Sequence, residues 1–137
     1  MNPKNLQKYI DLAFLLYEEN YEMRTQHFTF AVLKNRILTI GRNQKKSHSI
    51  HRRNPRICEN GEKVTNKSIC SEWAALSKIK NTMNVSFSKI TLINVRINRL
   101  KKVANSNLCT SCRSLVRFLG VKKIYYTNNT GQFEKFE

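Results

Sequence analysis

The sequence predicts an α/β domain in which helices cover both faces of a mixed central sheet, a three-layer α/β/α arrangement. Segments with helical periodicity alternate with β-rich segments along the chain, and no linker or internal repeat interrupts them. We therefore expect one domain, residues 1–137. Only a short turn at residues 128–131 separates the last two predicted strands. These strands should pair antiparallel, because a parallel return needs about a dozen residues or more.

The N-terminal third predicts one helix followed by a hairpin. Residues 5–18 place their apolar side chains on one stripe, and their polar face carries acidic residues rather than a basic surface. This pattern favours packing on a core over lying on a membrane. Residues 28–33 and 36–40 are two β-rich runs separated by two residues, which predicts antiparallel pairing.

The remainder of the chain predicts two helices and three strands. Helical spacing recurs at 69–79 and 112–119, and β-rich segments occupy 90–97, 121–127 and 132–136. The alternating segment 90–97 is the expected central strand. Gly120 is well placed to cap the second of these helices.

Positive charge is concentrated in the middle of the chain. The formal net charge is +16, and residues 23–133 contain 22 of the 25 basic residues but only three of the nine acidic ones. Such a field attracts a nucleotide phosphate or a polynucleotide backbone, although it also fits solubility alone. The irregular segment 44–68, here called the basic loop, is expected to wall the active site. In this loop His48 is a candidate contact for substrate or phosphate, with a solvated loop histidine as the alternative.

The four cysteines are the strongest chemical signal. The N-terminal segment does not resemble a signal peptide, and no apolar run is long enough to span a membrane, so we expect a cytoplasmic protein with reduced thiols. Cys70, Cys109 and Cys112 fall at the starts of the two helical segments, with Glu72 beside the first. Three thiols suit a catalytic zinc ion that leaves its fourth position for water. Helix N-termini favour the thiolate form. Two disulfides are the alternative.

This pattern, Cys-x-Glu followed by Cys-x-x-Cys, resembles the zinc-dependent cytidine and deoxycytidylate deaminase superfamily in its three-cysteine variant. The resemblance covers about residues 28–126. It implies a zinc ion held by the three cysteines, a proton shuttle at Glu72, and hydrolytic conversion of cytosine to uracil in a free nucleoside or nucleotide. It also implies that Asn43 contacts the substrate sugar, where an ordinary turn asparagine is the alternative. Leu108 stands where the superfamily usually has proline.

Two rival functions stay open. One is deamination of cytosine or adenine in single-stranded DNA or RNA through the basic loop, although only Trp73 and Phe87 offer aromatic stacking between residues 37 and 89. The other is a non-catalytic zinc module that binds nucleic acid, with Cys58 as a fourth ligand; otherwise Cys58 is expected to be a free thiol. Such a module has no need of Glu72. No membrane partner is expected, and a homo-oligomer is compatible with the sequence.

Three thiolates on a divalent ion would leave net negative charge in this site. We expect Arg113, the basic loop or the backbone N–H groups of the helix starts to offset it.

Overall fold

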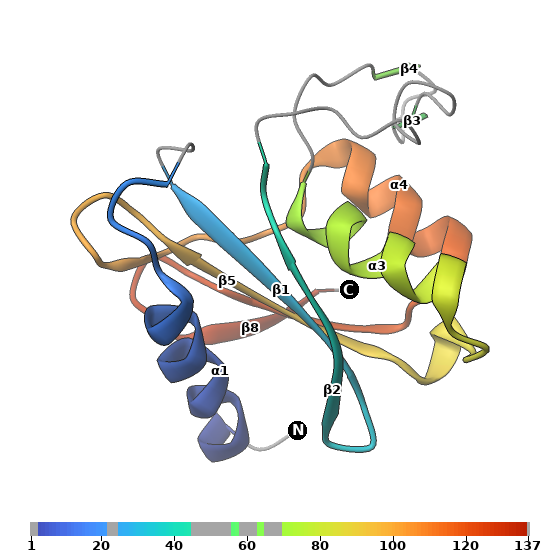
Figure 1. The fold of residues 1–137 in the computed structure, drawn as a ribbon, viewed down its shortest axis with the longest axis horizontal. Helices are drawn as coiled ribbons and strands as arrows, with labels where there is room; N and C mark the ends of the chain where they lie inside the picture. Colours follow the sequence, from blue (N-terminus) through green and yellow to red (C-terminus); the bar gives the residue numbers. More distant parts are fainter. Residues whose placement is uncertain (1–2, 22–24, 45–55, 58–62, 65–69, 137) are drawn as a thin grey trace.

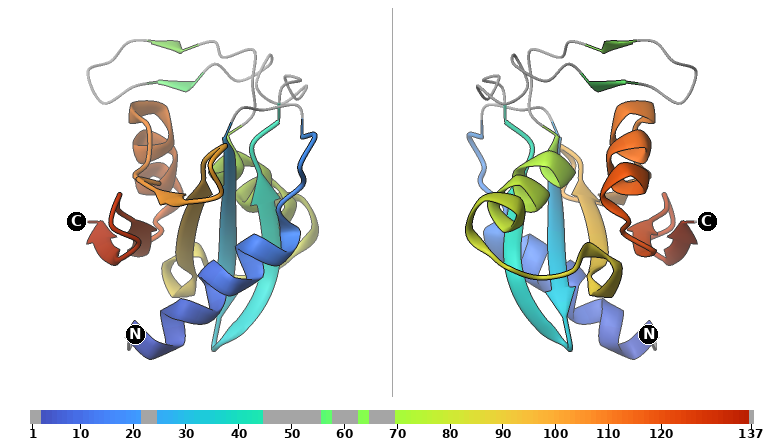
Figure 2. Two further views of the ribbon diagram at one scale, coloured as in Figure 1. Left: turned by 90° about the vertical axis from the view of Figure 1, so that its left-hand side faces the viewer. Right: turned by 90° about the vertical axis from the view of Figure 1, so that its right-hand side faces the viewer.

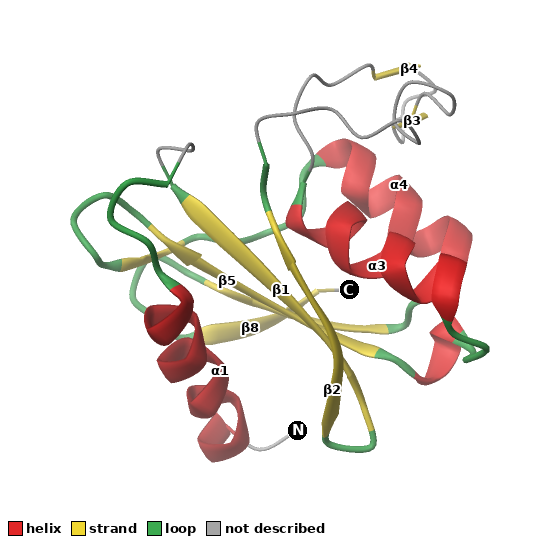
Figure 3. Ribbon diagram, viewed as in Figure 1, coloured by secondary structure: helices red, strands yellow, loops and turns green. Residues whose placement is uncertain are grey.

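The computed structural model describes residues 3–21, 25–44, 56–57, 63–64 and 70–136 (Figure 1). Its helices are α1 (Pro3–Leu16), α3 (Ser71–Thr82), α4 (Thr110–Leu119) and the short 3₁₀ helix η1 (Phe87–Lys89). Its strands are β1 (Gln26–Leu33), β2 (Arg36–Arg42), β3 (Arg56–Ile57), β4 (Lys63–Val64), β5 (Thr91–Ile97), β6 (Val103–Ala104), β7 (Lys123–Thr127) and β8 (Phe133–Phe136). Figure 3 shows these elements coloured by type.

A mixed sheet forms the middle layer. Within the described residues the order of its strands is β2-β1-β5-β7-β8, and β6 pairs with the C-terminal end of β5. Strands β5 and β7 are parallel, whereas β1 is antiparallel to both of its neighbours. The final pair, β7 and β8, is antiparallel, which confirms the prediction made from the short turn before β8.

The predicted N-terminal hairpin is present and has a turn suited to strand twist. Lys34 and Asn35 join β1 to β2, and both have positive φ, 49° and 65°. Two successive left-handed residues are typical of a type I′ turn, whose twist matches that of the flanking strands. The turn sets the register of the first pairs, and an irregularity between Ala31 and Val32 then shifts it by one residue.

Helices cover both faces of the sheet, which confirms the three-layer architecture. Figure 1 shows α1 on one side of the sheet and α3 with α4 on the other, and the side views in Figure 2 agree. The apolar stripe of α1 packs on one face through Leu6, Tyr9, Ile10 and Ala13. The opposite face packs against α3 and α4 in a second core that includes Leu76, Ile79, Leu92, Cys112, Val116 and Ile124.

The layers bring the starts of α3 and α4 together. Both helices begin at the same end of the sheet, where β1 begins and β5 ends (Figure 2). Gly120 ends α4 in the left-handed conformation at φ 85°, as the sequence predicted, and its N–H donates to Val116 O. Among the described residues, no helix combines the length and apolar character needed to cross a membrane.

Candidate metal centre and catalytic carboxyl

Three cysteine sulfurs converge between the two helix starts. Cys70 and Cys109 are the N-cap residues of α3 and α4, and Cys112 lies in the first turn of α4. The three Sγ atoms lie within 4.8 Å of one another, with 3.9 Å between Cys70 and Cys109. A tetrahedral zinc ion about 2.3 Å from each sulfur would hold two sulfurs about 3.8 Å apart. The spacing of this cluster, here called the three-thiol cluster, therefore fits zinc.

The three thiols share one negative charge when no metal is bound. Hydrogen bonds from Cys112 and Cys70 lower the pKa of Cys109, so its sulfur is the thiolate. The same contact with Cys109 raises the pKa of Cys70 to about 11 and that of Cys112 well above its usual value. A metal ion binding here must displace the two retained protons, which makes its affinity depend on pH.

Glu72 is buried beside this cluster. It is the second residue of α3, and the carboxyl is 3% exposed. The pKa of Glu72 is raised to about 7: burial and the charge of Cys109 raise it, and hydrogen bonds from its own backbone N–H, from Cys112 and from Asn94 oppose them. The Asn94 amide donates to Glu72 Oε1 over 2.8 Å. A carboxyl with a pKa near 7 can both accept and release a proton at neutral pH.

A row of buried polar side chains holds that amide in place. The Thr29 hydroxyl lies 2.8 Å from both Asn94 Oδ1 and Ser71 Oγ. Ser106 Oγ donates to Asn94 O over 2.9 Å and lies 2.8 Å from the Thr127 hydroxyl. All five side chains are at most 1% exposed. Because Thr29 occupies Oδ1, the Asn94 amide group must present Nδ2 to Glu72.

Sequence reasoning missed this row. Its one visible signal is Asn94, a polar residue between apolar neighbours in the middle of the predicted central strand, where a buried amide needs a partner. The partners come from β1, from the segment before α4 and from β7, which periodicity alone does not bring together.

His27 and Arg96 form the next row on the same face of the sheet. They are direct partners in the β1–β5 register, one step beyond the Thr29–Asn94 pair. Burial lowers the pKa of His27 to about 4, and the charge of Arg96 lowers it further, while Cys109 acts in the opposite direction. Neither His27 nor Arg96 was named as a site residue from the sequence.

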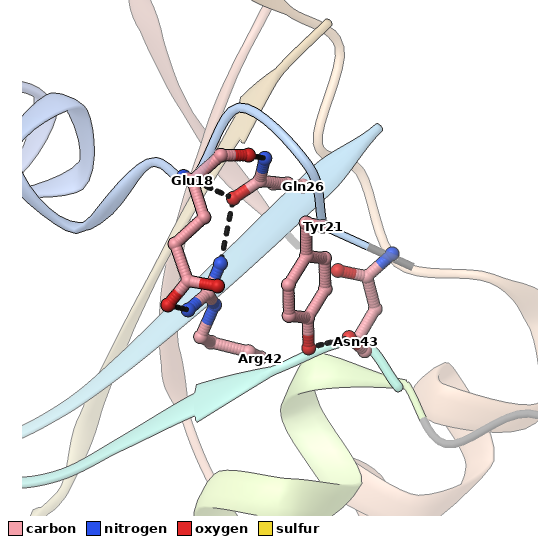
Figure 4. Close-up of polar contacts among 5 residues, drawn as sticks. All are labelled: Glu18, Tyr21, Gln26, Arg42 and Asn43. Carbon is pink, nitrogen blue, oxygen red and sulfur yellow. Dashed lines mark hydrogen bonds and ion pairs between the residues drawn. The ribbon is translucent and has the colours of Figure 1, made fainter. Parts of the chain in front are cut away.

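Asn43 lies at the end of β2 and fixes the start of β1. Its Oδ1 accepts a hydrogen bond from His27 N and its Nδ2 donates to Thr25 O, each over 2.9 Å. The Tyr21 hydroxyl donates to Asn43 O over 2.7 Å (Figure 4). Arg42 packs 4.1 Å from the centre of the Tyr21 ring. Asn43 therefore lies beside His27, at the same level of the sheet. Its contact with a substrate sugar stays a prediction.

The same corner ties α1 to the sheet. Arg42 forms an ion pair with Glu18 at 3.1 Å and donates to Gln26 Oε1 over 2.6 Å (Figure 4). Gln26 in turn donates to Glu18 O.

The segment leading into Cys109 is held without the proline usual in the superfamily. Leu108 is 3% exposed, and its N–H donates to Asn107 Oδ1 over 2.8 Å. Arg113 Nε donates to Leu108 O over 3.2 Å, and its guanidinium lies over the Phe136 ring. A buried side chain and two hydrogen bonds thus replace the rigidity of a proline ring.

Two residues named from the sequence, His48 and Cys58, lie outside the described residues. Of the basic loop, the structure describes β3 and β4, which pair antiparallel.

The structure thus has a mixed sheet between one helix on one face and two on the other, with the three-thiol cluster at the starts of α3 and α4. Among solved structures, the chain is similar to the crystal structure of dCMP deaminase from the cyanophage S-TIM5 in complex with dCMP and dUMP. The TM-score is 0.56 at 23% identity, and the match covers 93% of this chain and 84% of that chain. No protein-family model matches the sequence, and a search of curated proteins found no match. The likeness shows a cytidine-deaminase-like fold, and the spacing of the three-thiol cluster fits a zinc ion.

Proposed function

We propose that this protein is a zinc-dependent hydrolase that converts cytosine to uracil in a free nucleotide or nucleoside. The observation that carries the proposal is Glu72, a buried carboxyl with a pKa near 7 placed beside three thiols but not needed as a ligand. A purely structural zinc site has no use for such a group. The likeness of the fold to a dCMP deaminase supports the reaction class.

Cys70, Cys109 and Cys112 are the residues that would hold zinc. A bound zinc ion supplies Lewis acidity to a water molecule in its open fourth position. The chain itself keeps the sulfurs together by placing two of them at N-caps, where the positive end of each helix favours thiolates.

Glu72 is the proton carrier in this proposal. As the water oxygen bonds to C4 of cytosine, Glu72 takes one water proton and delivers it to N3. The second proton passes through Glu72 to the exocyclic amine, the C4–N bond breaks, and ammonia leaves with uracil as the other product. The Asn94 amide holds the carboxyl in place through Oε1 while these transfers occur.

Asn43 is the proposed contact for the sugar. Its side chain uses one donor and one acceptor on the backbone of β1 and on Thr25, so one N–H and one lone pair are left for a ligand. His48 is proposed as a further substrate or phosphate contact.

A free nucleotide is favoured over a polymer because the similar solved structure is a complex with dCMP and dUMP. Between residues 37 and 89, only Trp73 and Phe87 are available to stack unpaired bases.

The test is deamination of cytidine, deoxycytidine, dCMP, adenosine and single-stranded DNA and RNA in parallel, measured as ammonia release and product mass. Glu72→Gln should keep zinc and fold but lower turnover about 100- to 10,000-fold, because the amide preserves shape and cannot shuttle protons. Glu134→Gln, which changes an exposed carboxylate on β8, is the matched control and should match the wild type. Wild-type turnover by Glu72→Gln would refute the role of Glu72. Zinc binding with no deamination of any substrate would favour the non-catalytic module.

A further inference from the structure

Arg96 is a cation that forms no ion pair with any carboxylate of the described residues. The ion pairs among the described residues are Arg42 with Glu18 and Lys101 with Glu19, and neither involves Arg96. Its Nε is buried without a hydrogen-bond partner. The guanidinium makes one long hydrogen bond, from Nη1 to Asn105 O at 3.4 Å. A guanidinium has five N–H donors, so most of its capacity is unused. Arg96 as a whole is half-buried, but a buried N–H donor without a partner is costly, and a ligand anion would supply the partner.

Arg96 lies near the residues that hold the Glu72 carboxyl. It lies two residues beyond Asn94 on β5, on the same face of the sheet, or about 7 Å along the strand. Its guanidinium lies between His27 on β1 and Asn105, in the segment that leads to Cys109. Asn43 is hydrogen-bonded to His27 in the same row. The sugar of a nucleotide can bridge the distance between the Glu72 carboxyl and this row.

From this placement we infer that Arg96 binds the 5′-phosphate of a mononucleotide substrate, and that it sets the preference for nucleotide over nucleoside. The inference rests on the proposed function, and it moves the phosphate contact from the basic loop to a strand of the sheet. A guanidinium fork fits two phosphate oxygens at once, which a lysine does not. The His27 ring, directly opposite, has no hydrogen bond from a described residue and adds a further donor.

The arrangement favours a terminal phosphate over a polymer backbone. Arg96 is paired with His27 on one side and with Ala104 on the other, and its guanidinium contacts Asn105 O, so a single half-buried cation is available here. One such cation suits a single phosphate that ends a ligand. A polymer needs a row of exposed cations along its backbone.

The experiment compares dCMP with deoxycytidine in zinc-loaded wild-type protein, Arg96→Gln and Arg99→Gln. Arg99 is exposed just after β5, so its substitution removes the same charge without touching the site. Arg96→Gln should raise KM for dCMP about 10- to 100-fold, the loss expected for hydrogen bonds to a charged group, and leave KM for deoxycytidine within about twofold. Arg99→Gln should change neither.

A second readout does not require turnover. Inorganic phosphate, compared with chloride at equal ionic strength, should raise the melting temperature of the wild type and of Arg99→Gln but not that of Arg96→Gln. If no substrate is deaminated but this stabilisation depends on Arg96, the proposed function fails and the phosphate site stands.

Three results would overturn the inference while leaving the deaminase proposal intact. They are an equal loss for dCMP and deoxycytidine in Arg96→Gln, a loss confined to single-stranded DNA, and phosphate stabilisation that survives in Arg96→Gln. If Arg96→Gln does not fold, Arg96→Lys serves the same comparison. It keeps the charge but not the fork, so KM for dCMP should rise by a smaller factor and KM for deoxycytidine should not change.

Discussion

Replacing Gly41 by alanine would test whether the packing of α3 on β2 holds the site together. A Cβ at Gly41 would lie 2.1 Å from Ser71 O and 2.5 Å from Ala75 N. Both are backbone atoms of the first turns of α3, so no side-chain rotation relieves the contact. Real Cβ atoms essentially never approach within 3.0 Å of such atoms, so α3 must move away from β2 by about 1 Å.

That movement has two measurable consequences. Overpacking of this size costs about 1–3 kcal/mol, which corresponds to a melting temperature lower by roughly 4–12 °C for a domain of this length. Ser71 lies between Cys70 and Glu72, so the same shift displaces a cluster sulfur and the carboxyl. Zinc affinity should fall about 10- to 100-fold, the loss typical when the support of a metal ligand is disturbed.

The assay combines thermal unfolding with competition for zinc against a chelator. Gly120→Ala is the control, because a Cβ there meets nothing within 4 Å and only the left-handed φ of 85° is unfavourable. It should cost about 1 kcal/mol and leave zinc affinity unchanged. If Gly41→Ala matched the wild type in both melting and zinc affinity, the tight seating of α3 on β2 would be wrong.

Three further predictions concern the metal and the carboxyl. Metal analysis should find about one zinc per chain, lost in Cys70→Ser and kept in Cys58→Ser; the reverse pattern would refute the ligand assignment. In the metal-free protein, the raised pKa of Glu72 stabilises the fold below its usual value of 4.5, and this contribution is lost as the pH rises through about 7. The unfolding free energy of the wild type should therefore fall, relative to that of Glu72→Gln, by on the order of 3 kcal/mol over that range, and a pH-independent difference would contradict the shift. Asn94→Leu removes a hydrogen bond that lowers this pKa, so the acid limb of the pH–rate profile should move to higher pH; an unmoved limb would show that Asn94 does not tune the carboxyl.

Most of the architecture could be predicted because local patterns determine it. The apolar stripe at 5–18 corresponds to α1, which begins and ends two residues earlier, and the two β-rich runs after it form the expected hairpin. The short turn before β8 was enough to predict its direction, since chain length excludes a parallel return. The three cysteines could be grouped because each falls at a helix start, and the structure brings their sulfurs together.

The rest of the site depends on contacts between residues far apart in the sequence. Thr29 and Asn94 are 65 residues apart, and only the β1–β5 register makes them neighbours. His27 and Arg96 are paired by the same register. β6, two residues long, is too short for any periodicity to identify. Hairpin turns and helix caps are local, whereas the order and register of nonadjacent strands are not.

The electrostatics of the three-thiol cluster explain why both helices begin at cysteines. Three thiolates around a divalent ion would leave excess negative charge, and Arg113 was one group expected to offset it. The structure instead directs Arg113 to Leu108 O and to the Phe136 ring. The N–H groups in the first turns of α3 and α4 have no partners within their own helices, and each helix begins directly after a cysteine of the cluster. Because these dipoles belong to the backbone, they stabilise the thiolates without a mobile cation that could compete with the substrate or pair with Glu72. Arg96 can then keep its charge for a ligand anion.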